Sequence, residues 1–186
     1  RAEVIHGSVP DEPVIVCEHG MRLRVDLRRG QKTGLFLDHR ESRRRLRQLA
    51  QGRRVLNLYS YTGGFSVAAA LGGAERVDTV DVAAPAIEFA RQAFEDNGVG
   101  ETAHGLHVAD VPQFLQEAEG DWDLIVADPP SFAPNERSKA KALRSYRALH
   151  RACLRRLQPG ALYLAASCSS HIDAHSFEKS LLDAAE

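Results

Sequence analysis

Short apolar runs alternate with helix-type patterns along most of the chain. Five runs rich in Val, Leu, Ile and Ala have the pattern of buried strands: 54–58, 76–82, 106–110, 122–128 and 161–168. Apolar residues at helical spacing occupy other segments: 65–71, 85–97, a stretch around Phe114, one ending near Leu157 and one from about Asp173. This alternation predicts an α/β fold, a parallel sheet with helices on both faces.

The N-terminal part of the chain has a different pattern. Residues 14–17 and 21–27 are β-like, and the short polar stretch between them predicts a β-hairpin. We therefore separate residues 1–30, an N-terminal β-hairpin segment, from residues 31–186, which carry most of the alternating pattern.

Local signals predict two helix boundaries. Asp38 and Glu41 have the spacing of a capping box, so a helix is expected to start near Asp38. Pro159-Gly160 is expected to close the long helix that ends near Leu157.

The turn Tyr61-Thr62-Gly63-Gly64, between the strand at 54–58 and its helix, predicts a cofactor pocket. Adjacent glycines allow a sharp turn and leave room for a ligand above the strand end. The spacing Gly-x-Gly-x-x-Gly is absent, which disfavours NAD, and no Gly-Lys-Ser/Thr of a phosphate-binding loop follows. S-adenosylmethionine, which carries no phosphate, remains; the alternative is an ordinary strand-to-helix turn without a ligand.

Two acidic residues at predicted strand ends fit the same pocket. Asp81 lies where a carboxylate can accept both hydroxyl groups of a ribose. Asp110 is placed to accept the exocyclic amine of adenine, with Val82 and Val111 on either side of the ring. Each acid has a simpler interpretation as a helix cap.

Asp128-Pro129-Pro130-Ser131-Phe132 follows the fourth sheet strand. Two prolines fix the backbone after a strand-end carboxylate, and Phe132 offers a ring on which a flipped base can stack. The alternative is a rigid loop with a core phenylalanine.

Cys168, at the predicted end of the fifth sheet strand, decides the reaction. Carbon 5 of a pyrimidine becomes nucleophilic only after a thiolate adds to C6. A strand end leading to a helix N-terminus, with His171 nearby, is expected to lower the pKa of the thiol. The alternative is a small buried side chain, which is our interpretation of Cys153.

Composition fits a single globular domain, with 44% hydrophobic and 26% charged residues among 186. Three distant cysteines predict neither a disulfide framework nor a metal site, and no apolar run is long enough to span a membrane, so we expect a cytoplasmic protein.

The net charge of −1 hides two basic segments, 22–54 and 137–156. If both lie on one side of the sheet, they form a track for RNA, with Arg137, Lys139 and Tyr146 among the substrate-binding residues.

Together these motifs resemble the RlmI-like family of bacterial large-subunit ribosomal RNA methyltransferases that make 5-methylcytosine. The similarity runs from Glu18 and is most specific at 30–40, 57–65, 128–132 and 167–169. It implies a Rossmann-like class I methyltransferase fold in residues 31–186. It also implies a cofactor site that includes Thr33, Phe36, Asp38, Arg40, Asn57, Tyr59, Ser60, Tyr61, Gly63, Gly64 and Asp128.

The resemblance further implies the chemistry and the partner. Cys168 would attack the cytosine, Asp128 would bind its N3/N4 edge, and the partner would be ribosomal RNA. Family members carry an additional N-terminal RNA-binding module and a further C-terminal hairpin, so we expect this chain to be a truncated catalytic part. A homodimer is left open. The alternatives are N-methylation of a guanine or adenine and a non-catalytic RNA-binding module on the same scaffold.

Overall fold

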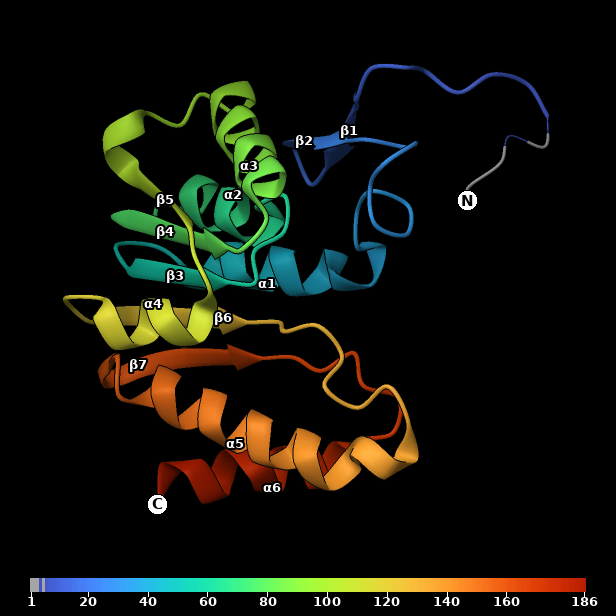
Figure 1. The fold of residues 1–186 in the computed structure, drawn as a ribbon. Coiled ribbons are helices and arrows are strands. Elements are labelled where there is room, and N and C mark those ends of the chain that lie inside the picture. The colour runs from blue at the N-terminus through green and yellow to red at the C-terminus, as the bar shows by residue number, and fades with distance from the viewer. Residues whose placement is uncertain (1–3, 5) are drawn as a thin grey trace.

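Five parallel strands form one sheet in the order β5-β4-β3-β6-β7 (Figure 1). The computed structural model describes residue 4 and residues 6–186. The predicted parallel sheet is confirmed, and β3, which leads into the Gly63-Gly64 turn, lies at its centre. The sheet strands are β3 (Arg54–Leu58), β4 (Arg76–Asp81), β5 (His104–Val108), β6 (Trp122–Ala127) and β7 (Leu157–Ala165).

Helices cover both faces of the sheet because successive strand residues point to opposite sides. Val55 of β3 packs in one hydrophobic cluster and Leu56 in another. The first cluster lies under α1 (Arg40–Leu49), α2 (Gly64–Leu71) and α3 (Ala84–Asp96). The second lies under α4 (Val111–Glu117) and α5 (Lys139–Leu154), and α6 (Ala174–Ala185) packs on α5 (Figure 1). Three short 3-10 turns complete the described chain: η1 (Leu37–His39), η2 (Glu101–Ala103) and η3 (Glu136–Ser138).

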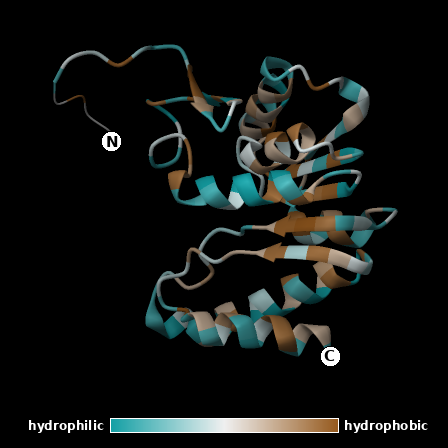
Figure 2. Ribbon diagram, turned by 180° about the vertical axis from the view of Figure 1, so that it is seen from behind, coloured by the Kyte–Doolittle hydropathy of each residue, from teal (hydrophilic) through white to brown (hydrophobic). Residues whose placement is uncertain are grey.

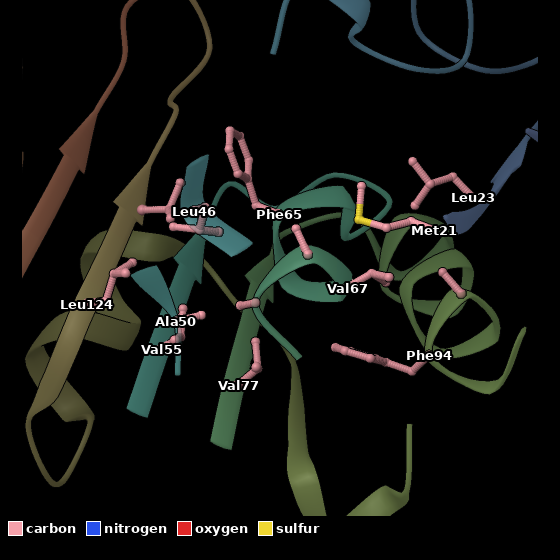
Figure 3. Close-up of a cluster of buried hydrophobic side chains, with 14 of the residues drawn as sticks. Met21, Leu23, Leu46, Ala50, Val55, Phe65, Val67, Val77, Phe94 and Leu124 are labelled. Carbon is pink, nitrogen blue, oxygen red and sulfur yellow. The ribbon is translucent and has the colours of Figure 1, made fainter. Parts of the chain in front are cut away.

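The predicted hairpin is also confirmed, as an antiparallel pair of β1 (Val14–Glu18) and β2 (Met21–Val25). Figure 3 shows Met21 of β2 beside Val67 of α2, in the same hydrophobic cluster as the central strands. Nε of Arg24 lies 2.6 Å from a carboxylate oxygen of Asp96, at the end of α3. The hairpin is therefore anchored by apolar packing and by an ion pair.

Polar residues dominate α1, although it packs against the sheet. Figure 2 shows this helix in the hydrophilic colour over most of its length, whereas strand β6 is in the hydrophobic colour over most of its length. Leu46 and Ala50 supply its inward stripe, and both are buried. A third inward residue, Arg43, is also buried and has a specific partner, described below.

The helix expected to start near Asp38 begins at Arg40, within two residues, whereas the predicted capping box and the predicted helix end at Pro159-Gly160 are wrong. The turn η1 precedes α1, and no side chain caps the start of either element, so Asp38 and Glu41 do not form a capping box. Helix α5 ends at Leu154, and Pro159-Gly160 lies inside β7. Proline is tolerated there because β7 is an edge strand and its pairing with β6 is irregular between Trp122 and Leu124.

Candidate functional site

A cavity of about 710 Å³ opens at the carboxyl ends of the sheet strands, where ligands of open α/β sheets bind. Its volume is in the usual range for a small-molecule site. Segments from the loop before α1, from the ends of β3, β4 and β6 and from the loop after β7 line it. Twelve of the residues expected from the sequence lie on its wall: Phe36, Asp38, Tyr59, Ser60, Tyr61, Gly64, Asp81, Val82, Asp128, Pro129, Pro130 and Cys168.

The turn after β3 has a backbone conformation that side chains rarely adopt. Tyr59, Tyr61 and Gly63 have φ values of 54°, 49° and 78°. A Cβ at Gly63 would lie 2.7 Å from Cβ of Ala90, so the turn and α3 approach each other closely only because residue 63 is glycine. No side chain caps α2, which leaves its first amides for a polar ligand.

A polar ligand is also indicated by Ser60. Its hydroxyl oxygen is buried on the cavity wall and has no hydrogen-bond partner among the described residues. Buried hydroxyl groups normally have a partner, because desolvation without a hydrogen bond costs about 1–3 kcal/mol. The residues present therefore fit a cofactor with hydrogen-bonding groups.

Asp81 ends β4 and is held rigidly. Its two carboxylate oxygens accept backbone N–H groups from Tyr61 at 2.8 Å and Ala83 at 2.9 Å. A carboxylate has about four lone-pair sites, so each oxygen retains room for a ligand hydroxyl. This geometry fits the expected ribose contact.

The loop before α1, residues 26–39, lines one side of the cavity, and we call it the roof. The hydroxyl of Tyr61 accepts the backbone N–H of Gln31 at 2.9 Å. The rings of Tyr61 and Phe36 meet edge to face, with centroids 5.4 Å apart, and Nζ of Lys32 lies 4.7 Å from the Phe36 centroid. The roof is therefore attached directly to the turn below it.

A buried ion pair fixes the roof from behind. The guanidinium of Arg43 donates two hydrogen bonds of 2.7 Å to the carboxylate of Glu18, and their side chains are 3% and 5% exposed. The remaining terminal nitrogen donates to the carbonyl of Phe36 at 2.9 Å. Arg43 thus links the hairpin, α1 and the roof.

Several residues expected to bind the cofactor lie outside the cavity wall. Asn57 is buried and donates to the hydroxyl of Ser66 at 2.8 Å, which holds the start of α2. Thr33 donates to the carbonyl of Leu35 at 2.7 Å, and Arg40 is exposed at the start of α1. Gly63 also lies off the wall and acts through the close packing described above.

Of the three residues expected to contact adenine, only Val82 lies on the cavity wall. Val82 is 71% exposed. Asp110 caps α4 by accepting the backbone N–H of Gln113 at 3.2 Å, and Val111 is buried in the second hydrophobic cluster. The simpler interpretation of Asp110 as a helix cap therefore describes its contacts in this structure.

Cys168 and Asp128 share the cavity with a third group that the sequence analysis missed. Nε2 of His39 lies 3.2 Å from Oδ2 of Asp128, and His39 is also on the wall. The hydrogen bond with Asp128 raises the pKa of His39 above its ordinary value. The thiol of Cys168 donates a weak hydrogen bond to the carbonyl of Pro129 at 3.7 Å.

The expected lowering of the Cys168 pKa is wrong. Burial raises the pKa of this thiol, and the nearby Asp128 carboxylate raises it further. Helix α6 begins only at Ala174, and Nδ1 of His171 lies 3.3 Å from Glu136, so neither stabilises a thiolate at residue 168. Cys153, by contrast, is buried in the core as expected.

The loop after β6 is stabilised by a buried tyrosine. The hydroxyl of Tyr146 makes hydrogen bonds with Ser167 at 2.8 Å and Ser169 at 2.9 Å, and its ring packs on Phe132. Tyr146 is 0% exposed, so the expected direct contact with RNA is wrong for this residue. Phe132 is half-buried against it, and neither ring lines the cavity.

The two basic segments do not form the expected one-sided track. Helix α1 covers one face of the sheet and α5 the other, because their inward residues pack in different hydrophobic clusters. Several arginines of the first segment are engaged within the protein, Arg43 among them. Arg137 is exposed, and Lys139 pairs with Asp173 at 3.3 Å. The cavity wall includes Arg29 and Lys32 of the roof and Arg43 of α1, and Arg43 is paired with Glu18.

His39 and Arg43 are the functional candidates that sequence reasoning missed. Both follow Asp38 within one or two turns, in a segment already expected to cover the cofactor. Arg43 also shares the helical face of Leu46 and Ala50, which was the available sign that it points inward. Nothing local in the sequence indicates that His39 meets Asp128.

Within residues 4 and 6–186, none of the helices has the length and the apolar sequence that a membrane span requires. The same part of the chain holds no cluster of three or more His, Cys, Asp or Glu side chains that could bind a metal ion.

Comparisons with known proteins extend over nearly the whole chain. A ribosomal RNA large subunit methyltransferase from Deinococcus radiodurans is 42% identical over 185 residues, covering 98% of this chain and 45% of that protein. A ribosomal RNA large subunit methyltransferase I from Erwinia tasmaniensis is 40% identical over 185 residues, covering 98% and 47%. The chain thus spans about half the length of these curated relatives.

Solved structures agree with this similarity. A methyltransferase crystallised with SAH superposes with a TM-score of 0.87 at 34% identity, covering 97% of this chain and 48% of that chain. A SAM-dependent methyltransferase from Streptococcus mutans superposes with a TM-score of 0.87 at 33% identity, with the same coverage. A family model described as S-adenosylmethionine-dependent methyltransferase matches residues 2–181. With its cofactor-type cavity at the carboxyl ends of a parallel sheet, the chain belongs to the S-adenosylmethionine-dependent methyltransferase family.

Proposed function

We propose that this chain is the catalytic part of an enzyme that methylates carbon 5 of a cytosine in large-subunit ribosomal RNA. The observation that carries the proposal is that Cys168 and Asp128 line the same cavity as the turn after β3. A nucleophile, a hydrogen-bonding carboxylate and the cofactor site can therefore act on one base. The names of the relatives from Deinococcus radiodurans and Erwinia tasmaniensis support ribosomal RNA as the substrate.

In the proposed reaction, Cys168 activates the base by covalent addition. Its thiolate forms a bond to C6, and the electron pair of the C5=C6 bond shifts toward C5 and N3. Asp128 hydrogen-bonds the N3/N4 edge. N3 takes a proton from solvent as negative charge develops there, and returns it when the aromatic ring is restored. Bound S-adenosylmethionine supplies the methyl group, as an electrophile on sulfonium sulfur.

Completion of the reaction restores the aromatic ring. Once C5 has bonded to the methyl group, it loses its proton to a base, and the released electron pair re-forms C5=C6. As this double bond re-forms, the bond between C6 and sulfur breaks, and its electron pair returns to the thiolate of Cys168. No second cysteine lies in the loop after Asp128, so release depends on Cys168 alone.

The remaining residues are assigned to binding. Tyr59, Ser60, Tyr61 and Asp81 would hold the cofactor, since they form the wall beneath the roof. Pro129 and Pro130 would shape the base site, and the roof cations would meet the RNA backbone. A role for Phe132, Arg137 and Lys139 in RNA binding remains part of the proposal, as does a cytoplasmic location beside the ribosome.

A second function is favoured by one observation. Burial and Asp128 raise the pKa of the Cys168 thiol, which opposes its use as a nucleophile. An enzyme that methylates an exocyclic nitrogen of guanine or adenine needs no thiolate. Asp128 and the two prolines would then hold the amino group of the base, and Cys168 would have no part in the chemistry.

Nucleoside mass spectrometry of large-subunit ribosomal RNA separates these possibilities. RNA is compared from cells with the gene, without it, and with a gene encoding Cys168→Ala. Our proposal predicts that 5-methylcytidine at one site disappears in both altered strains. An N-methylated purine lost on deletion but restored by Cys168→Ala would establish the second function, and unchanged RNA would refute both. Calorimetry of Cys168→Ala with S-adenosylmethionine is the folding control and should show unchanged affinity.

A further inference from the structure

The contact between His39 and Asp128 joins two parts of the chain that are far apart in sequence. His39 ends the turn η1 in the roof, whereas Asp128 follows β6 at the rim of the sheet. The side chains are 21% and 23% exposed, and the imidazole ring also lies against Phe65, with centroids 5.4 Å apart. The pair is therefore fixed by packing as well as by charge.

The carboxylate of Asp128 acts on two other groups in the cavity. It raises the pKa of His39, its hydrogen-bond partner, and it also contributes to raising the pKa of the Cys168 thiol. A thiolate at Cys168 must form beside this negative charge. An imidazolium on the same carboxylate offsets that charge.

Other charged side chains near His39 and Cys168 also act on the imidazolium or the thiolate, some favouring the charged form and some opposing it. Asp38, next to His39 in the turn, favours the imidazolium and opposes the thiolate. Arg43 of α1 opposes the imidazolium, but it is engaged by Glu18, and Lys32 of the roof favours the thiolate. Asp128 couples His39 to Cys168 most directly, because its effect on the pKa of each group is larger than that of Asp38, the other residue that acts on both.

We propose that His39 is a positioning residue for Asp128, and that its imidazolium offsets the carboxylate charge so that the Cys168 thiolate forms more readily while His39 is protonated. The inference rests on the proposed function, in which this thiolate attacks C6. His39 need not touch the base, and the thiol proton leaves to solvent. The same bond holds the Asp128 carboxyl group in place for the N3/N4 edge of the base.

This coupling has a pH signature that a purely structural role lacks. Below the pKa of His39 the imidazolium is present and thiolate formation is favoured. Above it the imidazole is neutral and Cys168 meets the full charge of Asp128. The thiolate population of the native protein therefore rises with pH in two steps, as expected for interacting groups.

The test measures the alkylation rate of Cys168 by iodoacetamide between pH 6 and 10, with peptide-resolved mass spectrometry. His39→Gln should react about threefold to tenfold more slowly than the native protein at pH 6.5, equivalent to a thiol pKa shift of about half to one unit. The difference should shrink as the pH rises through the pKa of His39 and the imidazolium loses its proton. The exposed Cys17 in the same sample is the internal reference and should react equally in both proteins.

Two more variants sharpen the result. His39→Lys keeps a positive charge at pH 9 and should remain faster than His39→Gln across the whole range. In an Asp128→Asn background, His39→Gln should have a smaller effect, because His39 has lost the carboxylate that raises its pKa. Equal rates for the native protein and His39→Gln at pH 6.5, or a rate difference that persists unchanged at pH 9, would overturn the inference.

The measurement is independent of the proposed reaction. Alkylation needs neither RNA nor methyl transfer, so the coupling is detected even if the enzyme methylates a purine nitrogen. If the coupling is absent while 5-methylcytidine still depends on Cys168, only the role of His39 fails. Should His39→Gln not fold, the two-step profile of the native protein carries the test, and a single step refutes the coupling.

Discussion

Removal of one member of the Arg43–Glu18 pair should destabilise the whole domain. The pair is almost completely buried and joined by two hydrogen bonds of 2.7 Å, so a single substitution leaves an uncompensated charge in the interior. The expected cost for Glu18→Leu or Arg43→Met is about 3–5 kcal/mol of unfolding free energy. With a slope of about 2 kcal/mol per molar urea, the unfolding midpoint should fall by about 1.5–2.5 M.

The double variant decides whether the unpaired buried charge or the lost packing causes the loss of unfolding free energy in the single variants. Glu18→Leu with Arg43→Met replaces the pair by apolar side chains and should cost less than either single change. Glu41→Gln is the matched control, because Glu41 forms an exposed ion pair with Arg44 on the same helix, and it should cost less than about 0.5 kcal/mol. The unfolding free energies of the four variants and of the native protein are measured by urea unfolding followed by circular dichroism. Single-variant costs below about 1 kcal/mol, or a double variant equal to the sum of the singles, would refute this reasoning.

Three further predictions follow from other buried groups. Ser60→Ala should leave the ligand-free protein as stable or more stable, because a buried unpaired hydroxyl is removed, while calorimetry should show S-adenosylmethionine affinity reduced about fivefold. Gly63→Ala should lower the melting temperature and weaken cofactor binding, since its Cβ would lie 2.7 Å from Ala90 at a φ of 78°; unchanged melting would contradict this. Burial lowers the pKa of His150 to about 4 from 6.5, so only the unfolded chain binds this proton between those values. Stability should therefore fall by up to about 3 kcal/mol as the pH drops from 6.5 to 4, and urea titrations of His150→Phe should show a weaker pH dependence.

The sheet, and the site residues that follow the carboxyl ends of its strands, could be predicted from the sequence for a physical reason. Strand and helix periods are local, and parallel strands bring their carboxyl ends to one rim whatever their side chains. The turn at Gly63, the acid Asp81, the motif at Asp128 and the thiol of Cys168 therefore had to lie near each other. The hairpin followed equally from its local pattern.

Contacts that depend on how a helix is rotated, or on which loop covers the rim, were not predictable in this way. Arg43 stands in a run of arginines that resembles a solvated face, and its partner Glu18 belongs to the hairpin. Tyr146 was assigned to RNA from the basic residues beside it, yet its ring fills the space under the loop at Phe132. His39 meets Asp128 only because the roof folds back over the sheet.

The central claim is that a cysteine and the methyl donor meet in one cavity at the rim of the sheet. It is tested most directly by incubating the protein with S-adenosylmethionine and large-subunit RNA that contains 5-fluorocytidine, whose fluorine cannot leave as a proton does. We predict a stable covalent adduct between RNA and protein, carrying the transferred methyl group and located by peptide mass spectrometry at Cys168. Methyl transfer to the RNA without an adduct, or an adduct at Cys17 instead, would contradict the account.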